Sequence, residues 1–130
     1  MRLLLDTHIW LWSRLDRRRL RGETVSALES PENELWLSPI SIWELAMLTE
    51  RGRVVLNVAV EAWIEDAMRR MPTRQATITH EIASASRAVD LPHQDPADRF
   101  LAATAKVMDL TLITADAQLA EVSDIAILRN

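Results

Sequence analysis

The sequence predicts an α/β protein in which a central parallel β-sheet of four to five strands is sandwiched by α-helices. The main observation is that short β-like runs alternate with segments of helical periodicity along the whole chain. The chain has 130 residues, with no low-complexity linker and no internal repeat. This length and uniformity predict a single domain over residues 1–130.

Apolar and β-branched runs predict the strands, and the last of them is expected at the outside of the sheet. The predicted strands cover residues 2–5, 34–38, 76–78, 110–114 and 125–128. The segments of helical periodicity predict the helices. These are expected from about Thr7 onward with Ile9, Trp12 and Leu15 on one face, then over 21–30, 40–52, 58–71, 82–89 and 96–108, with a short helix at 117–121.

Several residues mark where these helices begin and end. Gly52 suits the left-handed position after a helix, and Asn57 is a candidate N-cap for the segment that follows. Pro31 stops the second helix, because the residue before a proline is pushed out of the helical region. Asp95 is a good N-cap, and Pro96 fits the first helical position.

Composition excludes several classes of protein. The chain has no cysteine, which excludes a disulfide framework and a thiolate zinc site. Its apolar stretches are too short to cross a bilayer, and its first residues lack the pattern of a signal peptide, so we expect a cytoplasmic protein with no membrane contact. The formal net charge of −4 argues against coating of nucleic acid by bulk positive charge.

Two acids follow predicted strands. Asp6 ends the first strand, and Asp116 comes shortly after "TLIT". In open parallel sheets ligands bind just beyond the carboxyl ends of the strands, so both carboxylates are expected at the edge that binds ligands. Either acid could instead cap the helix that follows it.

Two further acids are harder to interpret singly. Asp98 falls in the first turn of its helix, where a negative charge meets the helix dipole, and this structural role would account for it alone. Glu44 lies within a helix among apolar residues, with no opposite charge three or four positions away. A carboxylate in such a setting must face water or have a specific partner, and a metal ion would be one.

If the four acids converge, their charges repel one another and the pocket requires a cation. Oxygen ligands alone select a hard ion, Mg²⁺ or Mn²⁺, which readily accepts phosphate oxygens. The chemistry that fits is phosphoryl transfer to water.

Four motifs carry a resemblance over essentially the whole chain: "LLLDTHIWLW", "SPISIWELAM", "LPHQDPADRFLAATA" and "LTLITAD". In this order and spacing they resemble a PIN domain, and specifically the VapC-type ribonuclease toxins of prokaryotic toxin–antitoxin pairs. The resemblance implies a PIN-like fold and metal-dependent cleavage of RNA phosphodiesters. It also implies a homodimer and a cognate antitoxin that blocks the active site. The catalytic residues and metal ligands it implies are Asp6, Glu44, Asp98 and Asp116.

The resemblance also separates the two acids of "DPAD". Asp98 matches the family's third acid, whereas Asp95 caps the helix and could support the site from beside it. Thr7 and Thr114 match hydroxyls that flank the site and could hold metal-bound water. One position departs from the pattern, because many relatives carry Lys where this chain has Leu48.

The arginines and tryptophans have two interpretations each. The clusters at 14–21 and 69–74 could be solvated faces, or the first could form a rim that guides RNA phosphates, as could Arg99 unless it pairs with a neighbouring acid. Trp10, Trp12 and Trp43 fall in apolar helical stretches, which favours core or dimer contacts over stacking on RNA bases.

Three rival classes share some of these features. A haloacid-dehalogenase-like phosphatase needs a second Asp two residues after Asp6, where this chain has His8. A receiver domain needs a late lysine after a strand, but the only lysine, Lys106, is in a predicted helix. A PIN-like module that binds nucleic acid or protein without catalysis remains the alternative.

Overall fold

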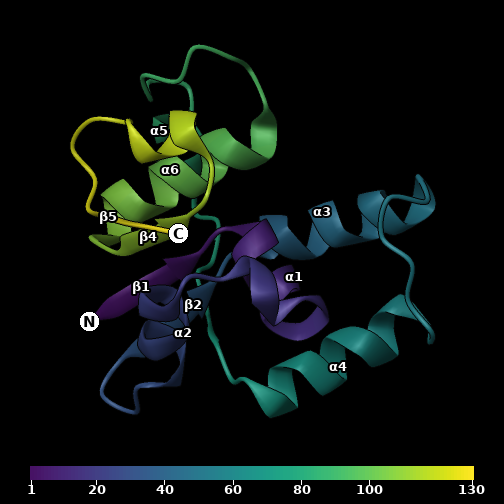
Figure 1. The fold of residues 1–130 in the computed structure, drawn as a ribbon. Coiled ribbons are helices and arrows are strands. Elements are labelled where there is room, and N and C mark those ends of the chain that lie inside the picture. Colours follow the sequence, from purple (N-terminus) through teal and green to yellow (C-terminus); the bar gives the residue numbers. More distant parts are fainter.

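The computed structural model describes residues 1–130 and contains one five-stranded sheet, in which every pair of neighbouring strands is parallel (Figure 1). The strand order is β3-β2-β1-β4-β5. The strands are β1 (Arg2–Leu5), β2 (Glu34–Leu37), β3 (Arg74–Gln75), β4 (Thr111–Thr114) and β5 (Ile127–Arg129). The predicted fold class is confirmed, including the place of the last strand at one outer edge.

Helices cover both faces of this sheet. They are α1 (Thr7–Leu15), α2 (Gly22–Glu29), α3 (Pro39–Glu50), α4 (Val60–Arg70), α5 (His80–Ala85), α6 (Pro96–Met108) and α7 (Ala117–Ala120), with a 3₁₀ turn η1 (Arg17–Arg19). None of them is long and apolar enough to span a lipid bilayer.

The two faces of the sheet bury separate apolar cores, because successive side chains of a strand point to opposite sides. On one face Leu3 and Leu5 pack with residues of α1, α2, α3 and α4. On the other face Leu4 and Leu112 pack with residues of α6 and α7. The central strand β1 is therefore buried on both sides, as its unbroken apolar sequence predicts.

The chain changes direction across the sheet beside β1. It builds β1, β2 and β3 towards one edge, then returns to add β4 and β5 on the opposite side of β1. The gap between the carboxyl ends of β1 and β4 is thus the topological switch point, where open α/β sheets bind their ligands.

Two predicted elements lie elsewhere than expected. The strand predicted at 76–78 is found two residues earlier, where Arg74 and Gln75 pair with β2 and only Ala76 N–H adds a further bond, to Leu37 O. β2 ends at Leu37, so the chain beyond Ala76 has no partner to pair with. The helix predicted over 82–89 is also wrong beyond residue 85, where α5 ends.

Two helix details also differ from the prediction. α4 begins after Ala59, and Asn57 makes no capping bond. The core side of α1 contains Ile9 as expected, together with Thr7, Trp10, Leu11 and Ser13, whereas Leu15 is 46% exposed. α1 buries this different face because Trp10 packs edge-on against Trp63 of α4, with ring centroids 5.3 Å apart.

Candidate active site

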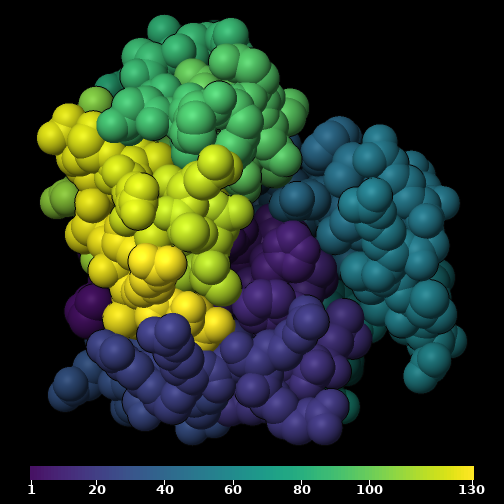
Figure 2. All heavy atoms as spheres, turned by 45° about the horizontal axis from the view of Figure 1, so that its top comes forward, coloured from purple at the N-terminus to yellow at the C-terminus, as the bar shows by residue number.

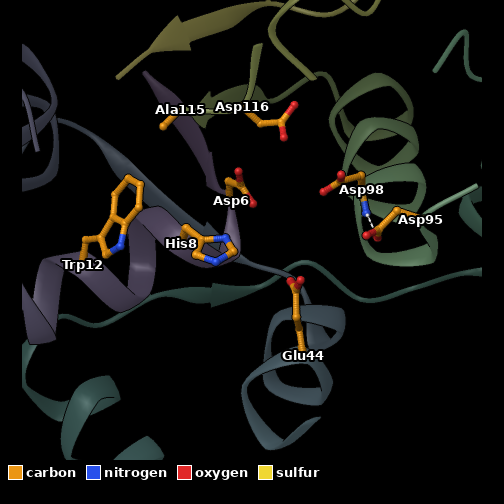
Figure 3. A pocket seen from close by; sticks show the side chains of 8 residues that line it. All are labelled: Asp6, His8, Trp12, Glu44, Asp95, Asp98, Ala115 and Asp116. Atoms are coloured by element: carbon orange, nitrogen blue, oxygen red, sulfur yellow. Dashed lines mark hydrogen bonds between the residues drawn. The ribbon is translucent and has the colours of Figure 1, made fainter. Parts of the chain in front are cut away.

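A pocket of about 380 Å³ opens at the switch point, and most of its lining is acidic. Figure 2 shows atoms of α1, in purple, at the bottom of a hollow between the α6–β5 part of the chain and α3. The residues that line the pocket are Asp6, His8, Trp12, Glu44, Asp95, Asp98, Ala115 and Asp116 (Figure 3). All four acids predicted from the sequence to form a site therefore line a single pocket.

Asp6 occupies the N-cap position of α1, but its side chain makes no capping bond. Instead the buried carboxylate accepts a hydrogen bond of 2.7 Å from Thr114 Oγ1 at the end of β4. The same Thr114 oxygen accepts the N–H of Asp116 at 3.0 Å. Thr114 thus ties together the two acids that follow neighbouring strands.

Asp116 both caps a helix and lines the pocket. Its Oδ1 accepts the N–H groups of Gln118 at 2.8 Å and Leu119 at 2.9 Å, which orients the start of α7. Its Oδ2 makes no hydrogen bond within the protein. Asp116 therefore caps α7 with one carboxylate oxygen and leaves the other oxygen free to act in the pocket.

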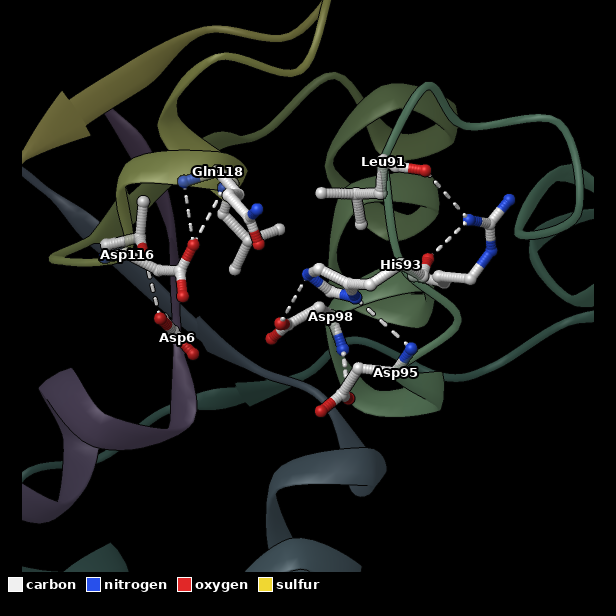
Figure 4. Close-up of polar contacts among 10 residues, drawn as sticks. Asp6, Leu91, His93, Asp95, Asp98, Asp116 and Gln118 are labelled. Carbon is white, nitrogen blue, oxygen red and sulfur yellow. Dashed lines mark hydrogen bonds and ion pairs between the residues drawn. The ribbon is translucent and has the colours of Figure 1, made fainter.

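The two acids of "DPAD" take different roles, which Figure 4 shows from close by. Asp95 is the N-cap of α6, and its Oδ1 accepts the N–H of Asp98 at 3.2 Å, as predicted. The Asp98 carboxylate is free of capping and lies 3.6 Å from Nε2 of His93. The other ring nitrogen of His93 accepts the N–H of Asp95 at 3.2 Å. His93 was not predicted as a site residue, because the three histidines show no zinc-ligand spacing and a metal-water mechanism needs no histidine base.

Glu44 faces the other acids from α3, on the opposite side of the pocket (Figure 3). It makes no ion pair or hydrogen bond, as the absence of charged neighbours in the sequence indicated. Thr7 does not line the pocket. Its hydroxyl pairs with Ser41 Oγ at 2.8 Å, and this buried bond ties the first turn of α1 to the first turn of α3.

The position of Arg99 differs most from the prediction. Both expectations for it, a place on the rim and a pair with a neighbouring acid, are wrong, because its side chain is buried and only 5% exposed. Its guanidinium donates to backbone carbonyls of the segment that precedes α6. The acceptors are the oxygens of Ser86, Arg87, Val89, Leu91 and His93, at 2.9 to 3.5 Å.

No arginine of the 14–21 cluster lines the acidic pocket. Arg17 pairs with Glu29, and Arg18 pairs with Asp16. Leu48, the position where many relatives carry Lys, is buried in the core formed by α1, α3 and α4 and is also absent from the pocket lining.

The pocket acids perturb one another electrostatically. Burial and the charges of Asp95, Asp6, Asp116 and Glu44 raise the pKa of Asp98 to about 7. The five carboxylates are therefore close enough to interact, and the negative charge on each one disfavours ionisation of the others.

The pKa of Asp6 is raised as well. Burial is the main cause that raises its pKa to about 6, and the charge of Glu44 adds to the effect. The hydrogen bond from Thr114 and the neighbouring His8 act in the opposite direction. A carboxylate that is partly desolvated and unpaired in this way is stabilised by any cation that enters the pocket.

The donor set fits a hard divalent ion. All the acids present oxygen atoms, which Mg²⁺ and Mn²⁺ prefer, and no cysteine is available to favour a softer metal. No group of three or more His, Asp or Glu side chains lies close enough together to hold an ion directly. Mg²⁺ commonly keeps several waters and takes only one or two carboxylates from the protein, so acids spread around a pocket suit it.

The raised pKa values predict how stability depends on pH in the absence of metal. Between about pH 4 and pH 7 the folded protein binds more protons than the unfolded chain, because Asp6 and Asp98 hold theirs to about 6 and 7 instead of 3.8. The free energy of unfolding therefore falls as the pH rises through this window. We expect it to be about 2 kcal/mol lower at pH 8 than at pH 5, measured by urea denaturation in EDTA.

The matched control for this pH dependence is Asp98→Asn, which should flatten the profile. Excess Mg²⁺ should also raise stability at pH 8 more than at pH 5. A profile that is unchanged by the substitution would show that the pocket acids do not cause the pH dependence.

Fold and site together define an α/β protein with an acidic pocket at the switch point of a parallel sheet. The PIN domain family model matches residues 3–125, and the chain belongs to this family. Ribonuclease VapC22 of Mycobacterium tuberculosis is 35% identical over 120 residues, which cover 90% of this chain and 88% of that protein.

Solved structures of low sequence identity share the fold. The structure of VapBC2 from Rickettsia felis bound to a DNA fragment from its promoter matches with a TM-score of 0.74 and 13% identity, covering 100% of this chain and 99% of the other. VapBC-1 from nontypeable Haemophilus influenzae matches with a TM-score of 0.68 and 20% identity, covering 99% and 98%.

Proposed function

We propose that this protein is a Mg²⁺- or Mn²⁺-dependent endoribonuclease and the toxin of a type II toxin–antitoxin pair. The observation that carries the proposal is the meeting of Asp6, Glu44, Asp98 and Asp116, from four separate segments, in one pocket at the switch point. The relative that is 35% identical bears the name ribonuclease, which supports RNA as the substrate. A structural neighbour described as a toxin–antitoxin complex, from Klebsiella pneumoniae, supports an antitoxin partner.

In this proposal the four acids surround the metal ion and would hold it partly through its bound waters, and each acid is positioned by its own element. Asp6 is oriented by the hydroxyl of Thr114, Asp116 by the backbone of α7, and Asp98 by the first turn of α6. Glu44 closes the set from α3. When bound, the metal would supply an activated water and offset the charge that develops on the departing oxygen.

The chain's other residues serve this arrangement. Asp95 holds the N-terminus of α6 and adds a fifth negative charge to the pocket. The bond between Thr7 and Ser41 keeps α3, and with it Glu44, against α1. An antitoxin would inhibit by covering the pocket, and we expect the active protein to be a homodimer, as is usual in the family.

Cleavage of a mixed pool of bacterial tRNA, rRNA and mRNA fragments by the purified protein tests this function. We expect cutting in Mg²⁺ or Mn²⁺, at least about 100-fold slower in EDTA, because the acids alone repel the RNA phosphates. Adding back excess metal should restore the activity, and sequencing of the new ends should identify the target. Cutting that persists in EDTA would contradict the metal-dependent mechanism. Absence of cutting, together with absence of metal binding, would favour a module without catalysis.

A further inference from the structure

One wall of the acidic pocket is aromatic. His8 and Trp12 are four residues apart in α1, so both lie on the same side of that helix. They are the only pocket-lining residues that are neither acids nor alanine (Figure 3). We refer to His8 and Trp12 as the aromatic wall.

The aromatic wall faces the pocket and is partly open to solvent, although Trp12 also packs against the edge of the core. His8 is exposed and Trp12 is half-buried, whereas Trp10, on the opposite side of α1, is fully buried against Trp63. The two rings of the wall lie 5.8 Å apart and tilted by 53°.

A positive charge accompanies the wall. The guanidinium of Arg19 lies over the Trp12 ring, 5.0 Å from its centroid, and the Arg19 side chain is 61% exposed. A cation over an indole face is attracted by the ring's quadrupole, so Arg19 of η1 helps to hold the Trp12 ring in place. Arg19 is also the arginine of the 14–21 cluster that contacts a residue of the pocket lining.

An RNA strand would meet two different surfaces here. Its phosphate can approach the acids only where a cation is present, and the flat faces of its uncharged bases find no stacking partner among carboxylates. The aromatic wall offers a flat π-face, which stacks on any base, and an arginine that attracts the neighbouring phosphate. The wall begins two residues from Asp6, so a strand whose phosphate lies at the acids has a flanking nucleotide within reach of it.

We infer that the aromatic wall of His8 and Trp12, backed by Arg19, is a stacking site for one base of single-stranded RNA beside the cleaved phosphate. This inference rests on the ribonuclease function proposed above and adds to it a place where substrate is recognised. Since stacking tolerates every base, the wall positions the strand more than it selects a sequence.

A cycle of changes in the protein and in the RNA tests the inference. The probes are fluorescein-labelled single-stranded RNAs that span the cleavage site mapped in the pool experiment, one intact and the others with a single abasic nucleotide. Binding is measured by anisotropy in Mg²⁺ with the Asp98→Asn protein, which should not cut the probe. Trp12→Met in this background is expected to weaken binding of the intact probe about tenfold. It should scarcely change binding of the probe that is abasic at one flanking position.

Two further variants separate stacking from a loss of structure. Trp12→Phe keeps an aromatic face and should restore most of the affinity. Trp36→Leu is the matched control, because Trp36 is also half-buried and contacted by two arginines, Arg2 and Arg74, but lies outside the pocket. Its RNA affinity should equal that of the parent.

A measurement without any substitution at the wall covers the case in which Trp12→Met fails to fold. A probe with 4-thiouridine beside the cleavage site should cross-link, in the Asp98→Asn protein, to a peptide of α1 that contains His8 or Trp12. Cross-linking confined to other segments would overturn the inference.

The outcomes distinguish this inference from the proposed function. If the wild-type protein cuts RNA but Trp12→Met binds every probe as tightly as the parent, the stacking site is wrong and the ribonuclease stands. An equal loss on the intact and on all abasic probes would also overturn stacking. If the wild-type protein cuts no RNA with any metal, the proposed function fails, and the inference fails with it.

Discussion

Asp98→Asn is expected to reduce RNA cleavage about 1000-fold while leaving the protein folded. Asparagine removes one negative charge from the pocket and presents a weaker metal ligand of nearly the same shape. Stabilisation of the transition state by a bound metal contributes several kcal/mol, and each 1.36 kcal/mol corresponds to a factor of ten in rate. The effect should therefore be seen in kcat with a defined oligonucleotide at saturating Mg²⁺.

A gain in stability should accompany this loss of activity. The pKa of Asp98 is raised to about 7 by burial and by the other pocket acids, so its carboxylate is destabilised at pH 8. Removing that charge should raise the melting temperature at pH 8 in EDTA, whereas a damaged fold would lower it.

Asp109→Asn is the matched control at the other end of the same helix. Asp109 follows α6 with a φ of 53°, a left-handed conformation that asparagine adopts readily, and it does not line the pocket. The Asp109→Asn variant should cleave RNA at the rate of the wild-type protein. Full activity of Asp98→Asn would remove this residue from the proposed metal site.

Arg99→Ala should cause the largest loss of stability, about 3 kcal/mol. The guanidinium supplies hydrogen bonds to carbonyls of residues 86–93, and alanine would leave several of them without a partner. A buried acceptor that loses its donor costs about 1–3 kcal/mol, although solvent that enters the cavity recovers part of this. Urea denaturation at pH 7 measures the change.

Arg69→Ala is the matched control for Arg99. Arg69 is 70% exposed and pairs with Asp66 on the surface of α4, where an ion pair contributes at most about 1 kcal/mol. Arg99→Lys should fall between the two, because a lysine keeps the charge but has fewer donors in a less suitable geometry. If Arg99→Ala unfolded at the same urea concentration as Arg69→Ala, the hydrogen bonds from Arg99 to the carbonyls would not contribute to the stability of the fold.

The contacts of Arg99 also explain why the helix predicted over 82–89 ends at Ala85. The carbonyls of Ser86, Arg87 and Val89 accept bonds from the guanidinium, so this segment follows a path around the arginine instead of continuing the helix. Helical periodicity in the sequence does not reveal a donor that comes from residue 99.

Local interactions account for the features that could be read from the sequence. Most of the strands were found because they are short apolar runs bounded by turns. Asp95, Asp116 and Gly52 could be recognised because they cap helices through bonds or backbone angles within a few residues. Asp6, Asp116 and Glu44 could be picked out because parallel strands end at one edge and because Glu44 has no partner within its own helix, whereas the resemblance to the PIN family was needed to choose Asp98 over Asp95. Apart from the choice of Asp98, each of these inferences needs only neighbouring residues and the topology.

Residue patterns therefore predicted the parallel α/β class, most of the helices and three of the pocket acids, and the family resemblance added Asp98. Only the tertiary structure decided the roles of Arg99 and Trp12. Arg99 stands four residues after Asp95, at the spacing of a helical ion pair, yet its bonds go to a segment as much as 13 residues away. Trp12 lies in an apolar run that indicates a core position, yet its ring is only half-buried and lines the pocket, because the packing of α1 against the sheet and α4 sets which face is fully buried. Burial is a property of contacts between distant segments, which no local pattern contains.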